Sequence, residues 1–488
     1  MAQGVLSYKY EVEKSKSGTT ALAGLPVYLD LAFVLNMGES IAAHLNIKDQ
    51  GWTDEQIVLS LILLNLAGGD CVDDLRILEA DQGFCRILQR VELKALPRKE
   101  RRETEKRWRK EKHRSIPSPS VVFRYLSAFH SDYVREDGKA IIPPLTELLS
   151  GLERVNRDLI ANINKQKPVN CATLDMDATL IQTEKLYALF SYKGYKAYQP
   201  LNTYWAEHGL ILHTEFRDGN VPAGHEQLRV FIHALSLLPE EIATVRLRSD
   251  TAGYQHELLK YCDGKHPSFG KIEFAVGCDV TSEFRKAAYK ADTWHPLFDK
   301  KGHITGEWAE VCFVPSKSAT KKGEPYRYIA IRERMRQPHF PGIDSLPFQT
   351  VTFDDTQYKL FGIVTNMDWE GSRLIHWQHE RCGKSEEAHS VMKEDLAGGK
   401  LPSSLFGVNA AWWWIMILAF NLNTAMKNLI LEDAWVPKRM KAIRFNLINL
   451  SGRIVEGSRE LYVRIAQGHP SLEVLLNARK RIMELVPS

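Results

Sequence analysis

Residues 169–181, VNCATLDMDATLI, contain the pattern that decides the fold class. Leu174 and Met176 alternate with Asp175 and Asp177, and this period of two predicts a β-strand with one apolar and one acidic face. Side chains two residues apart on a strand lie about 6.5 Å from one another on the same face. The two carboxylates are therefore expected to point the same way.

Further strands and helices surround this stretch. Strand-like sequences occur at residues 195–203, 210–216, 243–250 and 271–276, and helical sequences at residues 224–237 and 251–260. This order of strands and helices predicts a mixed α/β sheet. Asp250 ends the strand at 243–250, where a carboxylate is well placed for a functional site but is also common in solvent-facing turns.

The sequence after residue 279 has a different character. Alternating patterns at residues 309–314 and 326–332 flank a polar loop and predict a β-rich insertion, and a strand returns at residues 359–365. A helix is expected to begin after residues 382–383 and to end at residues 398–399. At about 100° per residue, one face of this helix carries Glu386, His389, Ser390 and Lys393. That face fits either a functional site or an amphipathic surface helix.

The first 165 residues read as helical. Thr53 and Gln56 form a capping box that opens an apolar run closed by the glycines at 68–69. A basic run at residues 98–114 is followed by a proline-rich loop and a short helix. Such a run is either a solvated helix face or a DNA contact. The candidate DNA contacts are Arg101, Arg102, Arg107, Arg109 and Arg124.

The charge of the chain is uneven. The 488 residues carry a formal net charge of +4. Residues 98–114 and residues 438–488 each carry +6, so the rest of the chain carries −8. A mildly acidic body with two basic zones indicates a polyanionic partner that is held at two places.

Several classes of protein are excluded by simple patterns. The longest apolar run, residues 410–420, is shorter than the roughly 20 residues that a membrane-spanning helix needs. The N-terminal residues have no apolar signal core. The seven cysteines are far apart and form no zinc-binding spacing, so neither a disulfide framework nor a zinc finger is expected. These patterns predict a reduced, cytoplasmic protein without a membrane partner.

The acidic residues suggest a common chemistry. Carboxylates gathered in one site repel one another and raise each other's pKa, and Mg²⁺ ions remove that cost because they take oxygen ligands. Two such ions can activate a water or a 3′-hydroxyl and stabilise the leaving oxygen, which is how phosphodiesters are cut and joined. Lys393 and Arg381 would hold the flanking phosphates, and His389 lies on the same helix.

The sequence resembles the bacterial insertion-sequence DDE transposases of the insertion-sequence-four superfamily, and within it the thirteen-eighty group. Four segments carry the resemblance: LDMDATLI (174–181), YKGYKAYQPL (192–201), RLRSDTAGY (246–254) and ERCGKSEEAHSVMKEDLAGG (380–399). The resemblance implies an RNase H-like core in which Asp177, Asp250 and Glu386 bind two Mg²⁺ ions, with Asp175 as a further ligand and Mn²⁺ as a substitute. Lys393, Arg381 and His389 would contact DNA.

The resemblance also implies a division of the chain. A helical DNA-binding region (1–165) precedes the first part of the core (166–279), a β-rich insertion (280–355), the second part of the core (356–430) and a basic helical C-terminal segment (431–488). In the insertion, Trp294, Trp308 or Tyr328 could hold a flipped base, or each could be a packing residue.

The function implied is cut-and-paste transposition. The protein would bind the terminal inverted repeats and the target DNA as a homodimer, in the bacterial nucleoid. Two alternatives remain at this stage. One is a transposon-derived DNA-binding protein whose catalysis has lapsed, and the other is an RNase H-fold nuclease without strand transfer.

Overall fold

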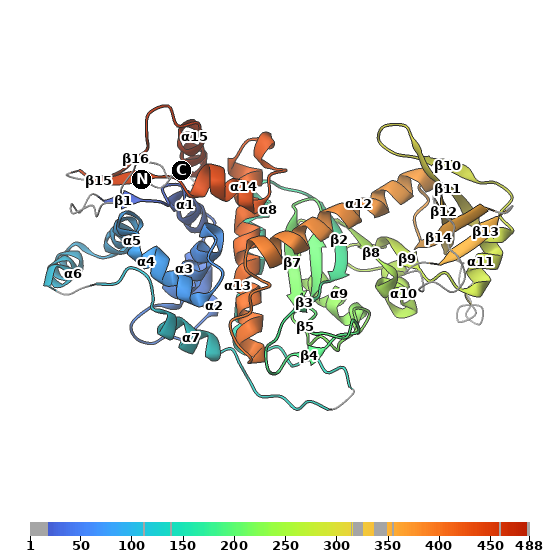
Figure 1. Ribbon diagram of the computed structural model, residues 1–488, viewed down its shortest axis with the longest axis horizontal. Coiled ribbons are helices and arrows are strands. Elements are labelled where there is room, and N and C mark those ends of the chain that lie inside the picture. Colours follow the sequence, from blue (N-terminus) through green and yellow to red (C-terminus); the bar gives the residue numbers. More distant parts are fainter. Residues whose placement is uncertain are drawn as a thin grey trace, which may run out of the picture.

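The computed structural model describes residues 18–110, 113–136, 139–313, 315, 326–335, 349–353, 356–457 and 460–485. In these ranges the chain forms a helical N-terminal part, a large mixed sheet and a C-terminal part that returns to the first helices (Figure 1). The predicted α/β class is therefore confirmed.

The N-terminal part is helical, as predicted. Its helices are α1 (Pro26–Val34), α2 (Met37–His44), α3 (Asp54–Ala67), α4 (Leu75–Ala80), α5 (Gln82–Ala95), α6 (Arg98–Lys110), α7 (Pro119–Ser127) and α8 (Glu147–Gln166). The capping box at the start of α3 is present, because Thr53 accepts from the Gln56 backbone and Gln56 accepts in return. Gly68, at φ 104°, ends the helix in the left-handed region that favours glycine.

The apolar run at residues 410–420 lies inside α13 (Phe406–Ala425), whose residues in that run are all buried. This helix packs against α3, α8 and β7 and stands at the centre of the molecule (Figure 1). A helix that is apolar on all sides must be covered on all sides. Among the described residues, no single helix meets the length and composition needed to span a membrane; only Asp54–Ala67 and Val72–Ala80 taken together do, and they meet at 94°.

Five strands form the core of the large sheet. Their spatial order is β7 (Leu210–Glu215), β6 (Leu201–Trp205), β2 (Cys171–Ala178), β8 (Thr244–Ser249) and β9 (Glu273–Cys278). The strand β6 is antiparallel to both neighbours, whereas β2, β8 and β9 are parallel. When these five strands are numbered in the order in which they occur in the sequence, their order across the sheet is 3-2-1-4-5, and strand 2 is antiparallel to its neighbours. This arrangement confirms the RNase H-like core.

The insertion continues this sheet instead of forming a separate one. Its strands are β10 (His295–Phe298), β11 (Ile304–Val311), β12 (Arg327–Arg334) and β13 (Thr350–Phe353), and they join the core through β14 (Thr356–Thr365). The last four residues of β14 pair with β9, and its whole length from Tyr358 pairs with β12. The polar loop between β11 and β12 lies outside the described residues. A smaller sheet has the order β3 (Ile181–Gln182), β5 (Lys196–Tyr198), β4 (Leu189–Phe190).

The helices of this part cover the sheet and its ends. They are α9 (Gln227–Ser236), α10 (His256–Asp263), α11 (Ser282–Tyr289) and α12 (Gly371–Ser390). Figure 1 shows α12 as a long helix crossing from the strands of the insertion towards α13, and it contacts β2, β8, β9 and β11. It covers the acidic face of β2, so both faces of that strand are buried.

The prediction that this helix begins after residues 382–383 is wrong. The helix begins at Gly371, where the Glu370 side chain caps it, and it runs through Gly383 without a break. An exposed glycine inside a helix weakens it but does not end it. The helix is followed by a π-helical turn, Val391–Asp395, before the glycines at 398–399.

The C-terminal segment is helical at both ends, in α14 (Met440–Ile443) and α15 (Leu472–Glu484). Between them lies a hairpin, β15 (Gly452–Glu456) and β16 (Leu461–Arg464), that the sequence reading missed. The strand β15 also pairs with β1 (Thr19–Thr20), and α15 packs against α1. The C-terminal segment is therefore folded onto the first described residues.

The continuous course of α12 predicts opposite effects for two of its glycines. A Cβ added at Gly383 meets no atom within 4 Å, so Gly383→Ala should raise the free energy of unfolding by about 1 kcal/mol. A Cβ at Gly371 would lie 2.2 Å from the ring of Trp308, so Gly371→Ala should lower it by about 1–3 kcal/mol. Urea unfolding followed by circular dichroism measures both. A loss of stability in Gly383→Ala would contradict the unbroken helix.

Candidate active site

The parallel strands β2 and β8 bring two acidic residues together. Met176 of β2 is opposite Ser249 of β8, so Asp177 and Asp250 follow at the same edge of the sheet. Asp250 lies directly after β8, where its carboxylate accepts from the Ala252 backbone at 2.9 Å. The carboxyl ends of parallel strands are where α/β proteins place their sites.

The two carboxylates influence each other electrostatically. Burial raises the pKa of Asp177 and of Asp250 above the usual range, and the charge of Asp177 raises the pKa of Asp250 further. The guanidinium of Arg381 acts in the opposite direction on both. Two partly buried carboxylates of like charge are costly to keep ionised without a nearby cation.

Helix α12 supplies three side chains around Asp177. The Ser385 hydroxyl donates to Oδ2 of Asp177 at 3.2 Å. Arg381 Nη1 lies 3.4 Å from the same oxygen, and His389 Nδ1 lies 3.8 Å from it. All three α12 residues are buried. In the structure Arg381 and His389 both face this carboxylate, and their predicted contact with DNA stays a prediction.

Asp175 has a different environment from Asp177. It is fully buried, and both of its oxygens accept from the guanidinium of Arg248, at 2.6 and 2.8 Å. Arg248 also donates to the Trp377 backbone carbonyl at 2.6 Å, which ties α12 to the sheet. Because its oxygens are bound by the guanidinium, Asp175 is in no position to serve as the further metal ligand that the sequence suggested.

His389 is part of a buried hydrogen-bonded chain. The Trp413 indole donates to Thr214, which donates to the Asn202 amide oxygen, and the Asn202 nitrogen lies 3.1 Å from His389 Nε2. An amide nitrogen only donates, so Nε2 accepts and the ring proton sits on Nδ1, facing Asp177. Burial lowers the pKa of His389 to about 3, and the ring is neutral.

Sequence reasoning missed Asn202, Thr214, Ser385 and Arg248. For Arg248 a signal was available: it precedes Asp250 by two residues, as Asp175 precedes Asp177. In parallel register the two strands then place an acid beside a base. No comparable signal marks Asn202 or Thr214, because their outer partners, His389 and Trp413, come from distant parts of the chain.

Glu386 lies next to this site on α12. It is exposed and directly follows Ser385, so it projects about 100° around the helix from the serine that contacts Asp177. Lys393, in the π-helical turn, donates to the Leu180 carbonyl at 3.4 Å, just beyond β2. The structure thus places two acidic residues together and the third on the neighbouring helix.

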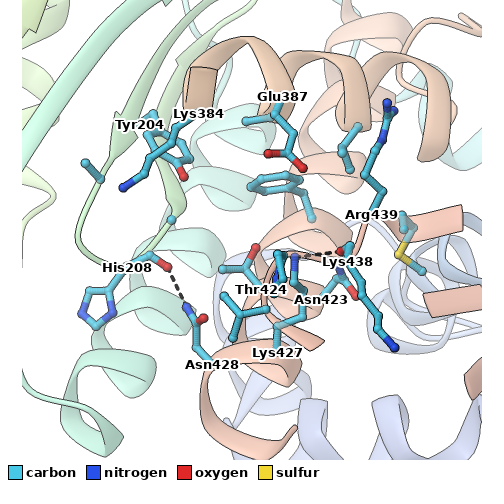
Figure 2. A pocket seen from close by; sticks show the side chains of 18 of the residues that line it. Tyr204, His208, Lys384, Glu387, Asn423, Thr424, Lys427, Asn428, Lys438 and Arg439 are labelled. Atoms are coloured by element: carbon cyan, nitrogen blue, oxygen red, sulfur yellow. Dashed lines mark hydrogen bonds between the residues drawn. The ribbon is translucent and has the colours of Figure 1, made fainter. Parts of the chain in front are cut away.

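A positively charged pocket lies on the other side of α12. Its volume is about 370 Å³. Figure 2 shows Lys384 and Glu387 of α12 among the side chains that line it, together with Lys427 and Arg439. Burial lowers the pKa of Lys427, whose ammonium donates to the Lys438 carbonyl at 3.0 Å. Lys384, Lys427, Lys438 and Arg439 outnumber its two carboxylates, Glu207 and Glu387, so the pocket suits an anion.

The arginines of the N-terminal part that are predicted to contact DNA differ in how exposed their side chains are. Arg102 and Arg107 are exposed on α6, and Arg124 is exposed on α7. Arg101 instead donates to the carbonyls of Leu93, Lys94 and Leu96 at the end of α5. Arg109 lies in α6, but its side chain is outside the described residues.

The C-terminal basic zone is partly used inside the protein. Arg444 donates to carbonyls at the end of α3, and Arg479 pairs with Asp30 at 2.6 Å. Arg439 lies 3.3 Å from the buried Asp395. A good part of the positive charge counted at residues 438–488 therefore holds this segment to the rest of the chain.

The three aromatic residues proposed for base stacking also differ in how far their rings are buried. Trp308 is buried against Gly371, and Tyr328 is buried with its hydroxyl 3.1 Å from that of Tyr254. Trp294 is half-buried, with the guanidinium of Arg332 over its ring at 4.2 Å. Trp308 and Tyr328 pack within the sheet region, and Trp294 alone of the three keeps a partly exposed ring.

The chain was compared with known families, proteins and structures. A family model described as transposase DDE domain group 1 matches residues 9–487. No curated protein matches the chain. Among solved structures it is similar to one described as a cryo-EM structure of the piggyBac transposase synaptic complex with hairpin DNA. That similarity has 10% sequence identity and a TM-score of 0.43, over 96% of this chain and 86% of the other.

The environments of Asp175 and Asp177 predict different costs of substitution. Asp175→Ala leaves Arg248 buried without its partner and should lower the free energy of unfolding by about 3–5 kcal/mol. Asp177→Ala should cost much less, because it also removes the repulsion with Asp250. Chemical unfolding of the two variants measures the difference. Equal losses would show that the Asp175–Arg248 pair does not stabilise the fold.

Proposed function

Because the chain belongs to the transposase DDE domain group 1 family, we propose that it cuts and joins DNA at the ends of a mobile element. Asp177 and Asp250, together at the carboxyl ends of β2 and β8, are the observation that carries the proposal. In finer terms, we propose a cut-and-paste transposase of the insertion-sequence-four superfamily, thirteen-eighty group. It would act on terminal inverted repeats and target DNA in the bacterial nucleoid.

We propose that Asp177, Asp250 and Glu386 hold Mg²⁺, with Mn²⁺ as a substitute. The raised pKa values of the two aspartates fit this, since a divalent cation favours their ionised forms. Ions held by these residues would supply activation of a water or 3′-hydroxyl and stabilisation of the leaving oxygen. Asp175 is left out of this set because Arg248 binds both of its oxygens.

The chain's own residues orient the acidic pair. Ser385 donates to Asp177, and the neutral ring of His389 directs its Nδ1 proton towards the same carboxylate. The charge of Arg381 opposes the raised pKa of both aspartates, although burial outweighs it. Lys393, at the edge of this group, is the side chain that we propose for a DNA phosphate.

DNA would be held by surfaces away from the acidic pair. Arg102 and Arg107 on α6 and Arg124 on α7 are exposed, and the basic pocket beside Glu387 offers further cations near α12. Phosphate contacts of this kind give affinity without sequence preference. We further propose that two copies of the chain assemble on paired DNA ends as a homodimer.

The assignment of Glu386 as a metal ligand is tested by comparison with its neighbour Glu387. Glu386→Gln, Asp177→Asn and Asp250→Asn should each lower cleavage of element-end DNA in Mg²⁺ by about 1000-fold or more, since several kcal/mol of charge stabilisation are lost. Glu387→Gln, which alters the basic pocket instead, should keep most of the cleavage rate. Gel assays of labelled end DNA measure the rates. A stronger loss in Glu387→Gln than in Glu386→Gln would reverse the assignment.

Cleavage, DNA-binding and strand-joining assays together separate the rival functions. A protein whose catalysis has lapsed would give no product with wild type or variants, although it would still bind the end DNA. A nuclease without strand transfer would cleave but would fail to join a pre-cut end to plasmid DNA. Cleavage and joining that both depend on Asp250 are the results expected here.

Binding through α6 is tested by its salt dependence. Replacing both Arg102 and Arg107 by Ala should weaken DNA binding and reduce the slope of log K against log salt by about 1.8, if each contacts one phosphate. Arg101→Ala serves as the control, because this side chain caps α5; it should lower the thermal midpoint and leave the slope unchanged. Fluorescence anisotropy across a salt series gives the slopes. An unchanged slope in the double variant would remove α6 from the DNA interface.

A further inference from the structure

A second group of ligand-type side chains lies apart from the acidic pair. Glu153 of α8, His213 of β7 and His233 of α9 present one carboxylate oxygen and two ring nitrogens that all lie within 4.8 Å of one another. Glu153 and His213 are buried, and His233 is 39% exposed at the rim. The strand β7 is the edge strand of the core sheet, and both helices pack against it.

The distances within the cluster differ from those of a simple hydrogen-bonded group. His233 Nε2 lies 2.9 Å from both oxygens of Glu153. His213 Nδ1 lies 2.7 Å from Oε1 of Glu153 but lacks the geometry of a hydrogen bond. Two ring nitrogens thus converge on one buried carboxylate. Hydrogen bonds explain the position of the His233 nitrogen but not that of the His213 nitrogen.

The carboxylate is suited to a cation. Burial acts to raise the pKa of Glu153, but the imidazoles of His213 and His233 outweigh it and hold the pKa at about 2. Glu153 is therefore ionised at neutral pH. The Glu153 carboxylate raises the pKa of His233.

A cavity of about 520 Å³ reaches the cluster. His213 and His233 line it, together with Trp414 and His225. It offers a path for an ion and room for a water molecule beside the two imidazoles. Sites with two histidines and one glutamate bind zinc and leave a fourth position for water.

We propose that Glu153, His213 and His233 form a binding site for a divalent transition-metal ion of the zinc class. Imidazole nitrogen is a ligand for such ions and not for Mg²⁺, so this site is chemically distinct from the acidic pair. Binding would tie α8, α9 and β7 together through one ion. The ion would stabilise the fold around β7, whatever the protein does to DNA.

The test is metal binding by the full-length protein. After treatment with a chelator, the protein is dialysed into excess Mg²⁺ and titrated with Zn²⁺ alone. Wild type should bind one equivalent, and its thermal midpoint should rise. His233→Gln, at the exposed rim, should lower the affinity by more than about 100-fold, since even residues behind a ligand contribute about 10- to 100-fold. His225→Gln, in the same cavity but outside the cluster, should bind like wild type.

Co²⁺ identifies the ligands independently. Bound at this site it should show the visible absorption of a four-coordinate ion, without the near-ultraviolet bands of thiolate ligands, and His233→Gln should abolish it. No binding in excess Mg²⁺, equal binding by wild type and His233→Gln, or thiolate bands from the free cysteines would each overturn the proposal. If Glu153→Gln and His213→Gln fold, their metal binding is compared with that of wild type in the same way. If they do not fold, the result for His233→Gln decides whether the site exists.

Discussion

The buried ion pair between Asp175 and Arg248 is the interaction on which the rest of the site depends. Arg248 sits on β8 and binds both oxygens of Asp175 on β2, so it joins the two strands that carry the acidic pair. Its remaining donor reaches the Trp377 carbonyl, and its guanidinium lies 4.9 Å from the Trp377 ring. One side chain thereby fixes β2, β8 and α12, and with them the positions of Asp177, Asp250 and Ser385. A charge this deeply buried is stable only because its partner and its hydrogen bonds are complete.

Local patterns were sufficient to predict much of the fold. The alternation around Asp177 and the strand ending at Asp250 were predicted because period-two hydrophobicity is a property of the segment itself. The start of α12 at Gly371 was missed because Gly383 was read as a helix breaker, although an exposed glycine costs a helix only about 1 kcal/mol. The hairpin β15–β16 was missed because its strands are short and mostly exposed.

The site was predicted less completely, for a physical reason. A helical wheel shows which residues share a face, but not which face meets the sheet. His389 was placed on the predicted helix, Arg381 was placed just before it, and both were assigned to DNA, whereas the structure has both on α12 and buries them against Asp177. Whether a carboxylate is free to bind an ion depends on partners far away in the chain, as Asp175 and Arg248 show. The same holds for the C-terminal arginines. Their charge can be counted from the sequence, but their carbonyl and carboxylate partners cannot be identified from it.

The strand β7 connects the two polar groups of the protein. Neighbouring residues of a strand point to opposite faces, and here His213 belongs to the cluster with Glu153 while Thr214 belongs to the chain that ends at His389. Two neighbouring residues of helix α13 also contact different groups. Trp413 donates to Thr214, while the ring of Trp414 lies 6.2 Å from that of His213. A displacement of β7 would therefore move Thr214 and, through Asn202, the imidazole that faces Asp177. An ion that fixed β7 against α8 and α9 would restrict that motion, so the order of the edge strand and the orientation of the acidic pair are physically linked.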